Sequence, residues 1–383
     1  MMSTSTTSAA AVCRQAAVIG GSLGGLAAAH ALQQTGWNVD VYERSSGPLD
    51  SKGSGLGFVH VPAWESLTGR PMMRRGRRAN RAQGSFYYGD LWKYLYQGLL
   101  EYNKNNSSKV IVHFGKNISE LQRQQSPLDD TVWVNGKPYN LVVICDGGFS
   151  SLRKYVLGNE NDAVVEPEYA GYVVWRGSIP VKKLPRNFHI EEGVYKNGIY
   201  DTIVLKMAKD DEDDLWTMGS FIATPEEGIK QYWNKERSGK SRHDVEDNAN
   251  RLRSVPDWFL RHFENNFQHV PGLVPLIQLM IERGGEITPH PQFEFGASKV
   301  HRGRTVLLGD AAHMASPRTA VGAHTAILDA LALRQTLLTN REKSEFRVEE
   351  ILGLYSSSGG GIERAQELYE RTRQVSKQFV PPG

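Results

Sequence analysis

The sequence predicts an α/β protein in which a parallel-sheet unit is interleaved along the chain with an antiparallel sheet. Over residues 15–43, an apolar run, a glycine-rich helix start and an alternating run follow one another, as in a β-α-β unit of about 30 residues. Residues 166–225 contain strand-like segments separated by polar turns, which is typical of an antiparallel sheet. An apolar run at residues 304–310 and the helical pattern after it return to the first kind of unit.

Glycines mark the boundaries of the first unit. Residues 15–20 (QAAVIG) are a short apolar run that ends in glycine, and they predict a buried strand. Residues 22–36 carry apolar side chains at roughly helical spacing, and Gly36 stops the helix. Residues 38–43 (NVDVYE) alternate between polar and apolar side chains, which predicts a second strand.

More strands are expected around a turn signal in the next part of the chain. Residues 109–115 (KVIVHFG) predict one of them. The pair Asn135-Gly136 between two β-rich runs is a strong signal for a hairpin. Its second arm is expected to be the run at residues 141–146 (LVVICD), which is apolar throughout, as a strand covered on both faces would be.

Helices are expected in the last third of the chain. Residues 244–267 have a helical pattern with a break at Pro256. A long helix is expected around residues 322–338, after the apolar run at 304–310. Residues 361–379 predict a charged helix near the end of the sequence.

Composition excludes several classes of protein. The 383 residues carry a formal net charge of +3, and the basic cluster at residues 74–81 has no interleaved aromatic residues, so we expect no nucleic-acid partner. No apolar run approaches the ~18 residues of a membrane span, so we expect no integral membrane association. Two cysteines and the acidic run at residues 209–214 provide no metal site. Residues 1–12 lack the pattern of a signal peptide, which favours a cytoplasmic location.

The turn at residues 20–25 (GGSLGG) predicts nucleotide binding. Gly20 permits the tight turn, and Gly25 permits the helix to pack close to the strand. Ser22 stands where a second glycine is expected, and it is small enough for a phosphate to approach the backbone. The start of the helix presents N–H groups and a positive dipole end to a pyrophosphate. Glu43 ends the second strand, where an acid binds ribose hydroxyls.

Two further motifs carry a resemblance to a known family. Residues 145–153 (CDGGFSSLR) look like the Asp-Gly motif ADGxxSxVR, and residues 307–330 (LLGDAAHMASPRTAVGAHTAILDA) look like the Gly-Asp motif GDAAHxxxPxxGxGxNxAxxDA. Together with the glycine turn, the sequence resembles the single-component (group A) FAD-dependent aromatic hydroxylases of the para-hydroxybenzoate-hydroxylase-like class. Residues 169–180 (YAGYVVWRGSIP) resemble the strand YxAWRGLVP of the 2,6-dihydroxypyridine hydroxylase-like branch.

The resemblance implies a Rossmann-like FAD-binding domain interleaved with an antiparallel-sheet substrate domain. The FAD-binding domain is expected to be discontinuous, with residues 1–65, 85–165 and 290–383. The substrate-binding domain is expected to consist of residues 66–84 and 166–289. An enclosed pocket between the two would keep water away from the reaction.

The resemblance also assigns residues to non-covalently bound FAD. Asp310 would bind the ribitol, Pro317 would lie beside the flavin ring, and the helix that begins near Gly322 would aim its dipole at the pyrimidine edge of the ring. Asp146 would face the pyrophosphate and the path of the nicotinamide cofactor. The full set of expected contacts is Gly20, Ser22, Leu23, Gly25, Glu43, Arg44, Gly55, Ile118, Asp146, Gly309, Asp310, Pro317, Gly322 and Ala323.

The activity implied by the resemblance is that of a monooxygenase. NADPH or NADH would reduce FAD, and O2 would add to give a C4a-hydroperoxyflavin that hydroxylates an electron-rich aromatic or heteroaromatic substrate. Two alternatives remain open from the sequence. One is a flavin-dependent epoxidase or oxidative-rearrangement enzyme acting on a prenyl, terpenoid or indole natural product. The other is a protein that binds FAD without turnover.

Three residues are candidates for contact with the substrate. Arg176 and Tyr200 lie on expected strands, and Arg318 follows Pro317 in the Gly-Asp motif. Residues of these types in a strand are more often ordinary sheet surface than substrate ligands. The sequence names no catalytic base.

The chain departs from the family pattern at three further positions. Ala320 replaces the first glycine after the proline of the Gly-Asp motif, and His324 replaces the usual asparagine. Tyr88 stands at the start of a helix where the family often has an arginine, which weakens the case for a phosphate clamp there.

Overall fold

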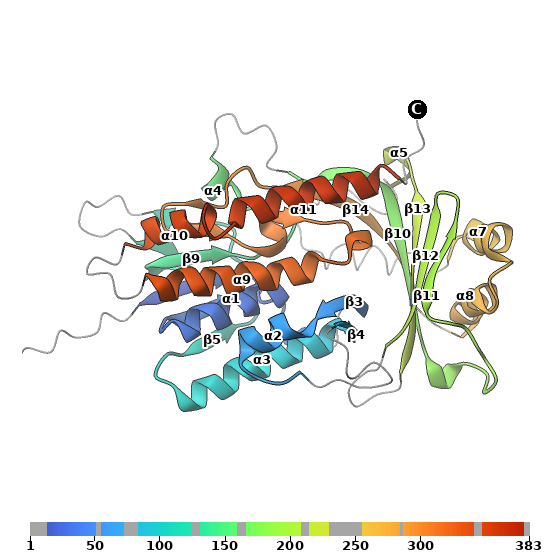
Figure 1. Ribbon diagram of the computed structural model, residues 1–383, viewed down its shortest axis with the longest axis horizontal. Helices are drawn as coiled ribbons and strands as arrows, with labels where there is room; N and C mark the ends of the chain where they lie inside the picture. Colours follow the sequence, from blue (N-terminus) through green and yellow to red (C-terminus); the bar gives the residue numbers. More distant parts are fainter. Residues whose placement is uncertain are drawn as a thin grey trace, which may run out of the picture.

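The computed structural model describes residues 14–50, 55–72, 83–123, 131–158, 166–207, 214–229, 255–283, 286–340 and 347–378. These residues form two six-stranded sheets that lie beside each other, each with its own helices (Figure 1). Five parts of the sequence discussed above lie outside the described residues: residues 1–12, the basic cluster at residues 74–81, residues 209–213 of the acidic run, residues 244–254 of one expected helix, and residue 379 of the last expected helix.

The first sheet is parallel except at one edge. Its strand order is β15-β16-β9-β1-β2-β5. The central strand β1 pairs in parallel with β2 and β9, and only β15 and β16 form an antiparallel pair. The strands are β1 (Gln15–Ile19), β2 (Asn38–Tyr42), β5 (Val110–His113), β9 (Leu141–Ile144), β15 (His301–Arg302) and β16 (Thr305–Leu307).

Helices and a small sheet cover this first sheet, which explains its apolar central strands. Helix α1 lies against β1, β2 and β9 and packs in turn on α9 and α3. All four residues of β9 are buried, as expected for a parallel strand covered on both faces. The helices of this part are α1 (Leu23–Gln34), α2 (Val61–Thr68), α3 (Tyr88–Asn105), α4 (Lys154–Leu157), α9 (Gly322–Thr339) and α10 (Val348–Ser356). Helix α11 (Gly361–Ser376) contacts α9 and α10 but packs mainly on the second sheet.

The second sheet is antiparallel, with strand order β11-β12-β13-β10-β14-β17. Helices α7 (Asp257–Phe267) and α8 (Leu273–Glu282) cover the face that points away from the first sheet (Figure 1). The strands are β10 (Glu168–Pro180), β11 (Gly193–Asn197), β12 (Tyr200–Met207), β13 (Leu215–Ala223), β14 (Glu286–Gly296) and β17 (His313–Met314). Short helical turns occur at Val181–Lys183 (η1) and Glu226–Ile229 (α5).

The two faces of the second sheet have different partners, because side chains alternate along each strand. On β10, Val173 and Trp175 belong to the core cluster formed with α7 and α8. Tyr172 and Val174 belong instead to a smaller cluster with Phe221 on the opposite face, which is called the inner face below. The inner face points toward the first sheet (Figure 1).

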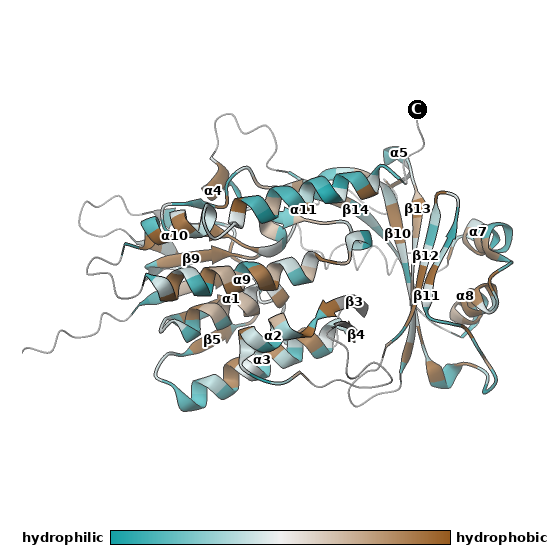
Figure 2. Cartoon of the chain, in the orientation of Figure 1, coloured by the Kyte–Doolittle hydropathy of each residue, from teal (hydrophilic) through white to brown (hydrophobic). Residues whose placement is uncertain are grey.

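Two smaller sheets complete the fold. A hairpin of β3 (Gly55–His60) and β4 (Gln83–Tyr87) contacts β12 through β4. A three-stranded sheet consists of β6 (Gln122–Arg123), β7 (Val132–Val134) and β8 (Lys137–Tyr139). Figure 2 shows that β9 is hydrophobic along its length and that α11 is largely hydrophilic, in agreement with the burial of the first and the surface position of the second.

The structure confirms the fold class and corrects one expected hairpin. The arms on either side of Asn135-Gly136 are β7 and β8, and the apolar run at residues 141–144 is not the second arm. It is the separate strand β9, which pairs in parallel with β1 and β16. A strand that is apolar on both faces gains more from a place inside a covered sheet than from an exposed hairpin.

The expected domain boundaries remain a prediction. The boundary between residues 289 and 290 falls within β14, a continuous strand whose first residues pair with β10 and whose last residues pair with β17. None of the helices in the described ranges combines the length and apolarity that a bilayer crossing requires.

Candidate functional site

The glycine turn brings α1 close to the ends of β1 and β9. Gly20 has a φ of 101°, and a Cβ atom there would lie 2.3 Å from the carbonyl oxygen of Cys145. A Cβ atom at Gly25 would lie 1.8 Å from the carbonyl oxygen of Gly20. Neither position therefore accepts a side chain, and the start of α1 lies at the carboxyl ends of the parallel strands. This is the place where such sheets bind nucleotides.

Glu43 is held at the same edge of the sheet. Its side chain is buried, with 6% exposure. Oε2 accepts the backbone N–H of Gly21 at 2.7 Å, and Oε1 accepts the backbone N–H of Ser45 at 2.7 Å. Each carboxylate oxygen has a second lone pair that remains suited to a ribose hydroxyl. The neighbouring Arg44 is exposed.

The turn is also tied to α3. Ser22 is the N-cap residue of α1, and its Oγ lies 2.7 Å from the hydroxyl of Tyr88. Trp92 donates its indole N–H to the carbonyl oxygen of Gly21 at 2.7 Å. Leu23 is buried at the start of α1. Sequence reasoning did not find Trp92, because its partner is a backbone atom 71 residues away.

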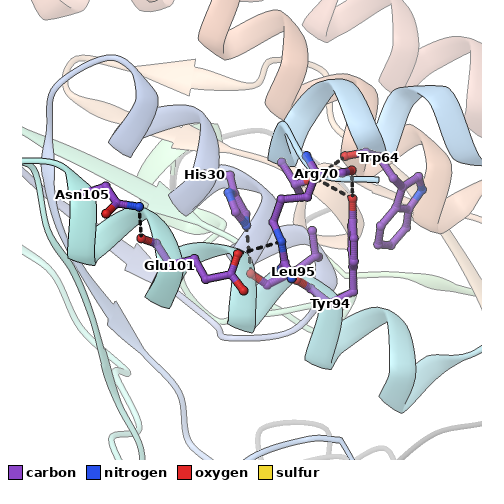
Figure 3. Close-up of polar contacts among 8 residues, drawn as sticks. His30, Trp64, Arg70, Tyr94, Leu95, Glu101 and Asn105 are labelled. Carbon is purple, nitrogen blue, oxygen red and sulfur yellow. Dashed lines mark hydrogen bonds and ion pairs between the residues drawn. The ribbon is translucent and has the colours of Figure 1, made fainter. Parts of the chain in front are cut away.

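A set of contacts farther along α3 joins this helix to α1 and to the segment that follows α2 (Figure 3). His30 on α1 lies 2.9 Å from the carbonyl oxygen of Leu95, and Arg70 forms a 3.0 Å ion pair with Glu101. Tyr94 donates to the carbonyl oxygen of Arg70 at 2.6 Å. Burial lowers the pKa of His30 to about 4, so this histidine is neutral at ordinary pH. The start of α3 is therefore held in a fixed position beside the glycine turn.

One buried arginine joins the Asp-Gly and Gly-Asp motifs. Arg153 has 0% exposure, and it donates through Nε to the carbonyl oxygen of Ala311 at 2.9 Å and through Nη2 to that of Gly148 at 2.7 Å. Its guanidinium also lies over the ring of Phe295, 3.6 Å from the ring centroid. Burial lowers the pKa of Arg153 to about 10, so the side chain is still a cation at neutral pH. The two loops therefore meet through contacts that sequence reasoning did not predict.

The side chain of Asp146 has a buried carboxyl oxygen that is not hydrogen-bonded within the described residues. Its Oδ1 atom is buried and, among the described residues, has no hydrogen-bond partner. Burial raises the pKa of Asp146 to about 6, although Ser150 and Arg153 act in the opposite direction. An orphaned carboxyl oxygen beside a glycine cradle fits a site that is completed by a polar ligand. The structure therefore agrees with a nucleotide cofactor at this edge.

A buried network of charged side chains holds the backbone of the Gly-Asp motif in place. Asp329 is buried, and its Oδ2 lies 2.7 Å from Nε2 of His313 and accepts the N–H of Gly309 at 3.2 Å. Arg364 donates to Oδ1 of Asp329 at 2.8 Å. Burial alone would lower the pKa of His313, but the charge and hydrogen bond of Asp329 outweigh it and raise the pKa. The network holds the backbone of Gly309, while the side chain of Asp310 is exposed beside it.

A cleft lies at the start of α9. Its volume is about 420 Å³. The rings of His60 and His324 are 5.5 Å apart at its wall, and burial, followed by the charge of His60, lowers the pKa of His324. Pro317 belongs to the short helix η4 (Pro317–Thr319), and Gly322 and Ala323 begin α9. The cleft is lined by His60, Arg318, Thr319, Ala320, Val321, His324 and Arg371.

The inner face of the antiparallel sheet presents polar residues beside this cleft region. The register places Arg176 opposite Thr288, on the same face as Val174 and His290. Nε2 of His290 lies 2.8 Å from Oγ1 of Thr288. Together with Phe221 and Ile203, these residues form an inner face that combines hydrogen-bonding groups with apolar surface.

Two contacts connect the loop before α9 to this inner face. Arg318 donates through Nε to Oδ2 of Asp201 at 2.7 Å. The hydroxyl of Tyr172 lies 2.5 Å from Oγ of Ser316. Asp201 is a contact that sequence reasoning missed, since β12 lies 117 residues from Arg318 in the chain.

Of the three substrate candidates, Tyr200 lies apart from Arg176 and Arg318. Tyr200 packs edge-on against His262 of α7, with ring centroids 4.7 Å apart, so it lies on the outer face. Of the remaining expected contacts, Gly55 begins β3 opposite Tyr87, and Ile118 is partly buried in the segment after β5. In the described ranges, no cluster of three or more histidine, cysteine, aspartate or glutamate residues is arranged to hold a metal ion.

Comparisons with known proteins agree with this geometry. The model of an FAD binding domain family matches residues 178–359, and that of an NAD(P)-binding Rossmann-like domain family matches residues 18–49. The chain is 26% identical to the 2,6-dihydroxypyridine 3-monooxygenase of Paenarthrobacter nicotinovorans, over 85% of this chain and 83% of that protein. It is 25% identical to the 6-hydroxynicotinate 3-monooxygenase of Pseudomonas fluorescens, over 92% of this chain and 88% of that protein.

The fold agrees with solved structures as well. The structure of Klebsiella pneumoniae HpxO complexed with FAD and uric acid superposes with a TM-score of 0.66 and 20% sequence identity, over 95% of this chain and 88% of that one. The glycine turn, the joined Asp-Gly and Gly-Asp motifs and the sequence relatives lead to the same assignment. The chain carries an FAD-binding-domain match and is similar, over most of its length, to the single-component FAD-dependent monooxygenases of the para-hydroxybenzoate-hydroxylase-like class.

Proposed function

We propose that this FAD-dependent monooxygenase hydroxylates a small, electron-rich heteroaromatic ring that already carries a ring hydroxyl, with NADPH or NADH as the reductant. The relatives named above are called monooxygenases of 2,6-dihydroxypyridine and of 6-hydroxynicotinate, and a further relative is called an FAD-dependent urate hydroxylase. All three names describe small nitrogen-containing rings that carry oxygen.

The residues that would hold FAD come from all three motifs. The uncapped start of α1 and the carboxylate of Glu43 suit the diphosphate and the adenosine ribose. The orphaned Oδ1 of Asp146 suits a polar group of the cofactor. The set proposed to contact FAD is Gly20, Ser22, Leu23, Gly25, Glu43, Arg44, Gly55, Ile118, Asp146, Gly309, Asp310, Pro317, Gly322 and Ala323.

One observation carries the proposal. Arg153 joins the Asp-Gly and Gly-Asp loops, and the loop that continues from the second motif is tied to the inner face of the antiparallel sheet through Ser316 and Arg318. A cofactor held by the two motifs would therefore face a surface that offers both polar and apolar side chains. This is the arrangement that an oxygenation site needs, because substrate and cofactor must meet where water is excluded.

The chain's own residues have defined tasks in this proposal. Bound FAD, once reduced by NAD(P)H, supplies activated oxygen. Arg176, Thr288 and His290 would hydrogen-bond the ring hydroxyl and ring nitrogen and so orient the carbon that is to be hydroxylated. Val174, Ile203 and Phe221 would contact the flat faces of the ring and exclude water. Orienting the substrate and excluding water are the contributions that a protein makes to such chemistry.

Substrate-stimulated oxidation of NADPH tests the proposal. FAD-loaded protein is incubated with hydroxypyridines, hydroxynicotinates, simple phenols and prenylated indoles, while NADPH absorbance and product mass are followed. We expect a hydroxypyridine-type compound to accelerate NADPH oxidation and to yield a product that is heavier by one oxygen atom. Arg176→Gln is expected to remove most of the acceleration, and Tyr200→Phe on the outer face serves as the matched control.

The other outcomes contradict the proposal in distinct ways. Oxygen insertion into a prenyl chain, with no turnover of hydroxypyridines, would assign the chain to epoxidation or oxidative rearrangement. FAD binding without any substrate-stimulated NADPH oxidation would indicate a flavoprotein that does not turn over. An equal loss of activity in Arg176→Gln and Tyr200→Phe would show that the inner face has no special part in substrate binding.

A further inference from the structure

A hydroxyl pair joins the glycine turn to the first residue of α3. Oγ of Ser22 lies 2.7 Å from the hydroxyl of Tyr88. Ser22 occupies the N-cap position of α1, where a serine ordinarily turns its oxygen onto the N–H groups of its own helix. Here Ser22 makes no side-chain cap, and its hydroxyl meets Tyr88 instead. The first N–H groups of α1 are therefore not capped by this side chain.

The position of Tyr88 is fixed by the rest of α3. Trp92, one turn later, donates to the carbonyl oxygen of Gly21 at 2.7 Å. His30 on α1 contacts Leu95 on α3 (Figure 3). A Cβ atom at Gly98 would lie 2.9 Å from Cε1 of His30. The two helices are thus closely packed where Gly98 meets His30. The hydroxyl of Tyr88 is consequently held beside the turn.

We propose that Ser22 and Tyr88 form an uncharged clamp for the diphosphate of FAD. In this clamp Tyr88 donates to Oγ of Ser22, and Ser22 donates its own hydrogen to a phosphate oxygen. The direction follows from acidity, because a phenol with a pKa of about 10 is a better donor than an aliphatic hydroxyl. The inference rests on the FAD site proposed above, and it makes Tyr88 a positioning residue that acts through Ser22.

The clamp has an electrostatic consequence. The two hydroxyls carry no net charge, so the diphosphate would be held at this point by hydrogen bonds together with the N–H groups and dipole of α1. The first turn of α1 contains no acidic residue that would oppose an anion. Salt screens an exposed ion pair but not a short hydrogen bond to a neutral hydroxyl. An arginine at position 88 would make FAD binding depend more strongly on salt.

Binding of FAD to the apoprotein tests the clamp, and it is measured by the quenching of flavin fluorescence. Ser22→Ala is expected to weaken FAD binding at least about tenfold, as when one hydrogen bond to a charged acceptor is lost. Tyr88→Phe removes only a bond to the neutral hydroxyl of Ser22 and is expected to weaken FAD binding about fivefold. The double variant is expected to be no weaker than Ser22→Ala alone, because both hydroxyls act through one contact. Tyr96→Phe, on the same helix, is the matched control and is expected to leave the Kd unchanged.

A salt series provides a second readout that a purely structural role would not move. Tyr88→Arg is expected to bind FAD more tightly than Tyr88→Phe at about 0.1 M salt and to lose this advantage near 1 M, where the screening length falls to about 3 Å. The wild-type Kd is expected to change much less over that range. Thermal unfolding of each apoprotein shows whether a variant is folded. If Tyr88→Phe does not fold, the Kd of Ser22→Ala is the result that tests the clamp.

Three results would overturn the clamp. The first is a Kd of Tyr88→Phe within about twofold of the wild type. The second is full additivity of the two substitutions, which would mean that the hydroxyls act independently. The third is a wild-type Kd as sensitive to salt as that of Tyr88→Arg. A wild type that binds no FAD would instead contradict the proposed function itself, so the two failures are distinguishable.

Discussion

Arg153 donates through Nε to the carbonyl oxygen of Ala311 at 2.9 Å and so joins two loops that are 158 residues apart in the chain. The first loop contains Asp146 and the second contains Asp310. A cation buried among carbonyl oxygens is stable only because its donors are satisfied. The relative position of the two acids therefore depends on this side chain.

Replacing Arg153 is expected to destabilise the protein and to weaken FAD binding together. In Arg153→Met the buried carbonyl oxygens of Gly148 and Ala311 lose their donor, which costs at least about 2 kcal/mol of unfolding free energy. Urea unfolding and FAD titration measure the two effects. Lys154→Met is the matched control, since Lys154 is exposed next to Arg153. An Arg153→Met protein with normal stability and normal FAD affinity would contradict this role.

Asp146 is expected to make the stability of the apoprotein depend on pH. Its pKa is about 6 in the folded chain and near 3.9 when unfolded. Stability from this group is fully present below the unfolded value and is lost as pH rises through about 6. The wild type therefore gains about 1.4 kcal/mol from this carboxyl between about pH 8 and about pH 5.

Asp146→Asn removes this titration. We expect the difference in unfolding free energy between variant and wild type to change by about 1.4 kcal/mol over that pH range, with the variant relatively more stable at about pH 8. Denaturant unfolding of FAD-free protein at both pH values measures it. Asp214→Asn is the control, because the side chain of Asp214 is 43% exposed and, among the described residues, pairs with the equally exposed Lys206. If the unfolding free energies of Asp146→Asn and wild type change equally with pH, the raised pKa of the buried Asp146 carboxyl is contradicted.

The parts of the site that could be predicted from sequence are those with local causes. The turn around Gly20, the helix that follows it and the acid Glu43 are set by neighbours within one β-α-β unit, and the structure has them where the pattern predicts. The long helix after Gly322 also follows its sequence pattern. These features need no knowledge of distant segments.

The parts that could not be predicted depend on register and on long-range packing. Tyr200 and Asp201 are adjacent, yet one faces α7 and the other faces Arg318, because a single step along a strand reverses the face. The sequence alone does not show which face of the sheet each of the two residues occupies. The partners of Arg153 and Trp92 are backbone atoms, which leave no sequence signal at all.

Ala320 is expected to carry backbone strain. Its φ is 56°, in the left-handed region where the Cβ atom is unfavourable and where the family pattern has glycine. Ala320→Gly is expected to raise the unfolding free energy by about 1 kcal/mol, as measured by urea unfolding. Asn135 has a φ of 51° and provides the comparison. Because asparagine tolerates this region, Asn135→Gly is expected to gain much less. An equal gain at both sites would argue against strain specific to Ala320.

The pair formed by Asp201 and Arg318 is expected to influence which substrate charge is accepted. The carboxylate of Asp201 lies 2.7 Å from Nε of Arg318 and neutralises it where the loop before α9 meets the inner face. Asp201→Asn removes that negative charge and leaves the guanidinium for a carboxylate on the substrate ring. We expect kcat/KM for 6-hydroxynicotinate, relative to that for 2,6-dihydroxypyridine, to rise about fivefold, which corresponds to about 1 kcal/mol.

Initial-rate kinetics with the two compounds measures this ratio, and Asp214→Asn, far along the sheet from Arg318, is again the control. A merely structural role for the pair would lower both kcat/KM values together and leave their ratio unchanged. A fall in the ratio would mean that Asp201 helps to bind the ring acid, which is the opposite of the charge argument. Because the ratio compares two substrates on one protein, it is independent of how much of the variant is loaded with FAD.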